Sequence, residues 1–171
     1  LGGRQVRTGK EHGQIFDHHA VEFTYEDGSK LFSQCQHISD CWTSVSEAAH
    51  GTKGSSQIDR GEIFDPSGKE TWSFGRGGRG GHQQEHHDLF AALRAGEIPN
   101  EGEYGAMSTM TSILGRMATY SGKLIKMKDA LASEIVLAPV DDYHTFADTP
   151  PVLPDENGRY DVPMPGSTTV V

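Results

Sequence analysis

The sequence is poor in cysteine, in long apolar runs and in basic residues. Its two cysteines, Cys35 and Cys41, are too few for a metal cage and lack C-x-x-C spacing, so we expect both to be small buried residues. No stretch of about 18 apolar residues occurs, so we expect no membrane span. With 24 acidic and 15 basic residues, the formal charge of -9 disfavours nucleic acid as a partner. The sequence thus predicts a soluble domain, without deciding between cytoplasm and periplasm.

Patterns for nucleophilic catalysis are also missing. There is no G-x-S-x-G elbow, and neither cysteine lies in a recognisable Cys/His frame. The triplet Ser121-Gly122-Lys123 resembles part of a phosphate loop, but the required first glycine is at the wrong spacing and a predicted helix precedes it. A helix that ends at glycine accounts for these residues. We therefore predict no catalytic residue in the chain.

Glycines, 21 in all, are plentiful, and one run imitates a nucleotide-binding loop. Gly75-Arg76-Gly77-Gly78-Arg79-Gly80 fits G-x-G-x-x-G between a predicted strand and a predicted helix. A dinucleotide site also needs a second parallel strand that ends in an acidic residue, and here a second long helix follows instead. The same run resembles an arginine–glycine RNA-binding box, but it holds two arginines in an acidic chain. We interpret it as a strand-to-helix connection.

The first half of the chain has the period-2 pattern of strands. Val21, Phe23 and Tyr25 alternate with polar or small residues, and Asp27-Gly28 supplies a two-residue hairpin turn before a return strand over 30–38. Turn signals at 51–54 and 65–68 separate further strands, which we predict at 42–50, 55–59, 62–64 and 70–74.

The second half has the period of helices. A helix over 83–95 carries an apolar stripe formed by His86, Leu89, Phe90 and Leu93. A longer helix starts at Asn100, the N-cap of a capping box, and ends at Gly122. Its core stripe contains Met107, Met110, Ile113, Leu114, Met117 and Tyr120, and its small side contains Gly105, Ser108, Ser112 and Gly115.

Strands followed by helices, without alternation, are typical of the α+β class. We predict an open antiparallel β-sheet with two main helices packed on one face, formed by residues 1–138. Six of the eight prolines lie from Pro139 onward, so residues 139–171 are predicted to form an extended proline-rich arm. Sheet residues that the helices leave uncovered predict a homo-oligomer through the open sheet face.

Of the nine histidines, five cluster at two places, His18-His19 and His82, His86 and His87. A metal site would need two of them and a carboxylate to converge. Neighbouring residues on a strand point to opposite faces, and His86 and His87 lie about 100° apart on a helix. We therefore predict no metal site, and metal-dependent hydrolysis stays a minor alternative.

Four segments, together and in this order, resemble one protein family. They are Ile15 to Phe23, His50-Gly51-Thr52-Lys53-Gly54, Glu85 to Gly96 and Leu114 to Lys123, and the likeness extends to Pro150-Pro151-Val152-Leu153-Pro154. The chain resembles the C-terminal half of bacterial Gfo/Idh/MocA-type oxidoreductases, which are named for glucose–fructose oxidoreductase, inositol dehydrogenase and a rhizopine-catabolism protein. The branch that it resembles is the one often seen in planctomycete-like genomes.

The resemblance implies a substrate and oligomerisation domain whose relatives act on a sugar, polyol or related carbohydrate. Those relatives bind NAD or NADP in an N-terminal Rossmann domain, which no position of this sequence matches. It therefore implies that the chain alone binds no cofactor and is inactive without that domain as its partner. A non-catalytic assembly or binding module is the alternative function.

Polar residues in predicted loops and at strand ends are the candidates for contact with substrate. These substrate-binding candidates are Asp17, His18, His19, Arg76, Arg79 and His82. No motif of the family assigns any of them a role.

Overall fold

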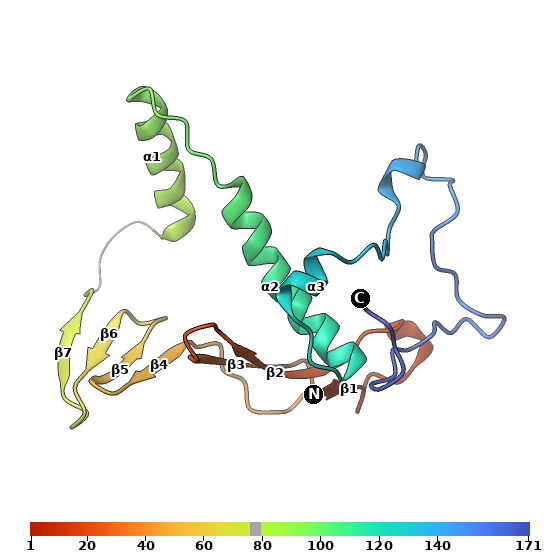
Figure 1. Ribbon diagram of the computed structural model, residues 1–171, viewed down its shortest axis with the longest axis horizontal. Helices are drawn as coiled ribbons and strands as arrows, with labels where there is room; N and C mark the ends of the chain where they lie inside the picture. Colours follow the sequence, from red (N-terminus) through yellow and green to blue (C-terminus); the bar gives the residue numbers. More distant parts are fainter. Residues whose placement is uncertain (76–79) are drawn as a thin grey trace. The chain divides into compact units, whose positions relative to one another are not determined.

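Two compact units make up the chain, whose computed structural model describes residues 1–75 and 80–171 (Figure 1). The first unit contains residues 1–39 and 101–171, and the second contains residues 40–100. Each has its own antiparallel sheet, ordered β1-β2-β3 in the first and β4-β5-β6-β7 in the second. The predicted α+β class is confirmed, with two sheets where the sequence predicted one. Residues 139–171, predicted to be a separate arm, belong to the first unit.

The sheet of the first unit is built on one hairpin. It consists of β1 (Gly2–Gly3), β2 (His18–Thr24) and β3 (Lys30–Gln36). The hairpin turn is longer than the predicted two residues, because the Tyr25 N–H donates to the Ser29 carbonyl at 3.0 Å and only Gly28 is left-handed, with φ of 84°. Asp27 keeps an ordinary φ and accepts the Ser29 N–H instead, at 2.9 Å. The loop is therefore a type I turn followed by a left-handed glycine.

Helix α2 (Gly102–Ser121) packs on β1 and β2 and carries most of the core. Its small side works as predicted, because a Cβ at Gly115 would lie 3.1 Å from the ring of Phe23. The Tyr120 ring packs against Phe16, with centroids 4.5 Å apart. The short helix α3 (Met127–Leu131) contacts α2 and buries Ala130.

The ends of α2 test the capping predictions. Gly122 ends the helix in the left-handed conformation, with φ of 68°, as predicted. The predicted start at Asn100 is wrong, because the first helical hydrogen bond runs from the Gly105 N–H to the carbonyl of Glu101, which is the N-cap. Glu101 itself makes no side-chain capping bond.

The rest of the first unit is irregular chain with two 3₁₀ turns, η1 (Lys10–His12) and η2 (Val140–Asp142). The arm makes the predicted turn at Asp155, whose carboxylate accepts the Arg159 N–H at 2.7 Å. It then returns to the end of α2, where the Gly166 N–H donates to the Ser121 carbonyl at 2.6 Å. The last part of the arm is therefore tied to the core helix.

The second unit is a four-stranded meander joined by tight turns. Its strands are β4 (Ala48–Gly51), β5 (Gly54–Gln57), β6 (Glu62–Phe64) and β7 (Glu70–Ser73). The predicted strand over 42–50 shrinks to β4, because only Ala48 to Gly51 find partners on β5. Helix α1 (Gly81–Arg94) follows and contacts none of these strands. The sequence predicted two helices packed on one sheet face, and the structure has one of them, α2, packed on the sheet of the first unit.

Candidate functional site

Asp17 lies at the start of β2 with a side chain that has no exposed surface. Its Oδ2 accepts three backbone N–H groups, from Gln5 at 2.7 Å, Val6 at 2.8 Å and Arg7 at 2.9 Å. Burial by itself would raise the pKa of Asp17, but these N–H groups and His18 together hold the pKa well below its usual range. The carboxylate is therefore ionised and fixes the N-terminal loop around itself.

His18 is oriented by that carboxylate. Its Nδ1 lies 2.8 Å from Asp17 Oδ1, and an ionised carboxylate can only accept, so Nδ1 carries the proton. In the neutral ring the lone pair is then on Nε2. The side chain of His18 is 40% exposed. A buried carboxylate that sets the tautomer of an accessible histidine is a common arrangement at ligand-binding and catalytic sites.

His19 is fixed from the other face of the strand, by α2. Its Nδ1 lies 2.9 Å from the hydroxyl of Thr119, which donates its only hydrogen to the Arg116 carbonyl at 3.0 Å. His19 Nδ1 must therefore be the donor, and Nε2 is again the acceptor. Burial lowers the pKa of His19, the positive charges of His18, the N-terminus and Arg116 lower it further, and Asp17 opposes them. The ring is neutral at pH 7.

A cation and an aromatic ring complete this group. The Arg116 guanidinium carbon lies 4.3 Å from the centroid of the Tyr120 ring. The His19 ring is nearly parallel to the same Tyr120 ring, with centroids 6.2 Å apart. We name this set the β2–α2 cluster; its members are Asp17, His18, His19, Arg116, Thr119 and Tyr120. It offers the acceptor nitrogen of the neutral His19 ring and one planar cationic donor, the Arg116 guanidinium.

The structure brings together three of the six predicted substrate-binding residues. Asp17, His18 and His19 share the β2–α2 cluster, although Asp17 has no surface of its own and can act on a ligand only through His18. His82 lies on the first turn of α1 in the second unit. Arg76 and Arg79 lie outside the described residues.

Sequence reasoning missed Arg116 and Thr119. Tyr120 was expected only as a core residue, and it is indeed buried. Thr119 meets His19 across 100 positions of sequence, so no local pattern could reveal the pair. The period of α2 does place residues 116, 119 and 120 within one turn, which is the only signal the sequence contains.

The described residues contain no group of three or more His, Cys, Asp or Glu side chains arranged to hold a metal ion. His18 and His19 have separate partners, as the alternation of a strand predicts. The prediction of buried cysteines is wrong: Cys35 and Cys41 are both exposed thiols, because β3 and the segment after it have no covering layer. Within residues 1–75 and 80–171, no helix has the length and apolar character needed to cross a membrane.

Comparisons with protein-family models, with characterised proteins and with solved structures find no match for this chain.

Proposed function

We propose that this chain is the substrate-binding and assembly portion of an NAD(P)-dependent oxidoreductase of the Gfo/Idh/MocA type, acting on a sugar, polyol or related carbohydrate. The observation that carries the substrate part is the β2–α2 cluster, in which Thr119 holds Nδ1 of His19 and leaves Nε2 of that neutral ring as a hydrogen-bond acceptor. A polyol presents many hydroxyl donors and no charge. The neutral His19 acceptor and the Arg116 guanidinium donor suit that pattern.

Hydride transfer would come from a separate nucleotide-binding domain, which orients the nicotinamide against the substrate carbon. This chain then contributes no catalytic residue and no contact with NAD or NADP. We therefore expect the purified chain to turn over no sugar with NAD or NADP. Turnover measured by NADH or NADPH absorbance would contradict it.

Carbohydrate binding can be tested directly by saturation-transfer NMR with glucose and myo-inositol. We expect signal transfer to the ring protons of at least one of them. His19→Ala removes one acceptor, so affinity should fall by about three- to tenfold, the range expected for one neutral hydrogen bond.

His144→Ala is the matched control, because His144 is exposed in the arm and only its backbone N–H is bonded, to Asp148. It should leave the transfer unchanged. If neither carbohydrate receives saturation, or if His144→Ala and His19→Ala behave alike, the assignment of the β2–α2 cluster is wrong.

A non-catalytic assembly module is the second candidate, and a separate observation favours it. No described residue of the second unit is buried, and every residue of β3 is exposed. Sheet surfaces of this kind are usually covered by a partner. We expect sedimentation velocity to show a homo-oligomer at micromolar concentration, and a monomer would count against assembly in both candidates.

A further inference from the structure

Helix α1 carries two histidines one helical turn apart, His82 and His86. At about 3.6 residues per turn, they share one side of the helix with Leu89, Phe90 and Leu93. The third histidine of α1, His87, lies about 100° from His86 and so off this side. One face of α1 is therefore a pair of imidazoles followed by an apolar stripe.

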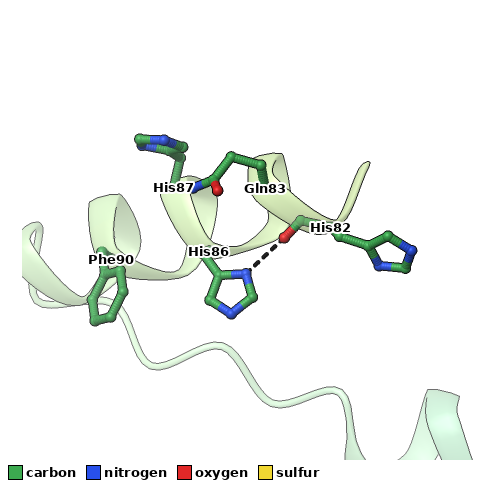
Figure 2. Close-up of a pocket in the computed structure, with 5 residues that line it drawn as sticks. All are labelled: His82, Gln83, His86, His87 and Phe90. Atoms are coloured by element: carbon green, nitrogen blue, oxygen red, sulfur yellow. Dashed lines mark hydrogen bonds between the residues drawn. The ribbon is translucent and has the colours of Figure 1, made fainter. Parts of the chain in front are cut away.

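His86 has the hydrogen bonding that a metal-binding histidine needs. Its Nδ1 lies 2.7 Å from the backbone carbonyl of His82, and a carbonyl can only accept, so Nδ1 carries the proton and Nε2 carries the lone pair (Figure 2). A ring N–H held by a backbone carbonyl is the usual second contact of a metal-binding histidine. Figure 2 shows the exposed His82 ring pointing away from His86, so chelation requires His82 to change rotamer.

We propose that His82 and His86 bind Zn²⁺ and that a second copy of the chain completes the site. Histidines at i and i+4 on a helix can both reach one zinc ion, with Zn–N distances of about 2.0–2.1 Å. Zinc prefers four ligands in a tetrahedron, and no third His, Cys, Asp or Glu joins the pair among the described residues. The same pair from a second α1 supplies four imidazoles.

The apolar stripe of α1 argues for the same partner. Leu89, Phe90 and Leu93 are 42%, 51% and 48% exposed, and α1 contacts no strand of its unit. Two parallel α1 helices that share a zinc ion at their N-terminal ends would bring these stripes together. Two charged side chains border this seam: the Glu85 carboxylate lies 3.7 Å from His86 Nδ1, and the Arg94 guanidinium carbon lies 5.9 Å from the centroid of the Phe90 ring. A helix of 14 residues is too short to pair strongly by itself, so the metal is expected to control the association.

The test is a zinc titration of the full chain at pH 7.5, followed by calorimetry and by light scattering. We expect one zinc ion per two chains, and a doubling of mass that EDTA reverses. His86→Ala and His82→Ala should each abolish the doubling.

His87→Ala is the matched control, since it removes an exposed histidine from the neighbouring residue of the same helix. It should retain the stoichiometry and the doubling, and circular dichroism should show equal helix content in all three variants. One zinc ion per chain without a change of mass, no zinc binding, or a doubling that persists in His86→Ala would each overturn the proposal. Association through the sheets, expected from the proposed function, is insensitive to EDTA, so the two proposals fail separately.

Discussion

The two units stabilise a short antiparallel sheet in different ways. All the buried residues among those described lie in the first unit, around Phe16 and the C-terminal half of α2. The second unit buries none of its described residues, yet its four strands keep a regular antiparallel pairing. Strand pairing here follows from turns and backbone hydrogen bonds. Burial follows from a helix that fits the sheet.

That fit depends on two features of the first unit. Gly115 leaves room for Phe23 against α2, and the Asp17 carboxylate gathers the N-terminal loop beside β2. In the second unit, Ile63 and Trp72 are cross-strand neighbours, and both stay about half exposed. A meander without a covered face has little stability of its own. The contrast predicts that the first unit is sensitive to its core and the second to its turns.

The largest effect is expected from Asp17→Ala in the first unit. It leaves three backbone N–H groups without the carboxylate that they share, at roughly 1–3 kcal/mol each, so we expect the free energy of unfolding to fall by about 4 kcal/mol. Urea unfolding followed by the near-ultraviolet signal of Tyr120 and its neighbours measures this loss. Asp27→Ala removes an exposed turn carboxylate from the same unit and should cost far less. Equal losses would show that Asp17 does not organise the loop.

In the second unit, Gly54→Ala should be the most damaging single change. Gly54 has φ of 146°, and an added Cβ would collide with the backbone carbonyl of Phe64 on the neighbouring strand. We expect a loss of about 3 kcal/mol in the local stability of the β5–β6 pair, seen as faster amide hydrogen exchange. Gly51→Ala is the control, because its nearest contact for an added Cβ is 3.9 Å away. Unchanged exchange in Gly54→Ala would show that this sheet does not depend on its turns.

A smaller effect separates the two ends of α2. Gly115→Leu overpacks the contact with Phe23 and should lower the free energy of unfolding by about 2 kcal/mol. Gly105→Leu places the same side chain on the same helix in open space, where better helix propensity should raise stability by about 0.8 kcal/mol. Urea midpoints of the two variants should therefore shift in opposite directions. Shifts of the same sign would mean that α2 does not meet β2 at Gly115.

The fold was predictable where local chemistry decides it. Alternation placed β2 and β3, the Gly51 and Asp65 turns placed the meander, and Gly122 marked the end of α2. The division into two sheets was not predictable, because it depends on which strand edges meet. The exposure of Cys35 likewise depends on the absence of a covering layer on β3.

The candidate site shows the same division. Asp17, His18 and His19 were found as neighbours in sequence at a predicted strand end. Their roles were not found, because the partners that fix the two rings are the Asp17 carboxylate, itself held by the Gln5–Arg7 loop, and Thr119 on α2. The contacts of Asp17 with the Gln5–Arg7 loop and of His19 with Thr119 span 10 or more positions of sequence and require the tertiary fold.

The smallest expected effect compares the two units through pH. The hydroxyl of Ser67 and the backbone N–H groups of Lys69 and Ser67 lower the pKa of Asp65, an exposed turn carboxylate of the second unit. A lowered pKa in the folded state gives stability that is present above the unfolded value of about 3.9 and is lost as pH falls through the folded pKa. Asp65→Asn should therefore speed exchange in the β6–β7 hairpin slightly at pH 6, and the difference from the unsubstituted chain should shrink as pH falls through the folded pKa of Asp65.

Asp17 follows the same sign with a larger shift, so its carboxyl carbon should titrate below that of Asp65 in carbon-detected NMR. Asp17 is lowered mainly by backbone N–H groups inside the fold, whereas the partners of Asp65 belong to its own turn. When the chain unfolds, the pKa of Asp17 should consequently return to its ordinary value. Asp65, whose partners lie within four residues, should retain part of its pKa shift in the unfolded chain. If both carboxyls titrate together in the folded chain, the buried loop and the exposed turn are equivalent, and the contrast between the two units does not extend to their charges.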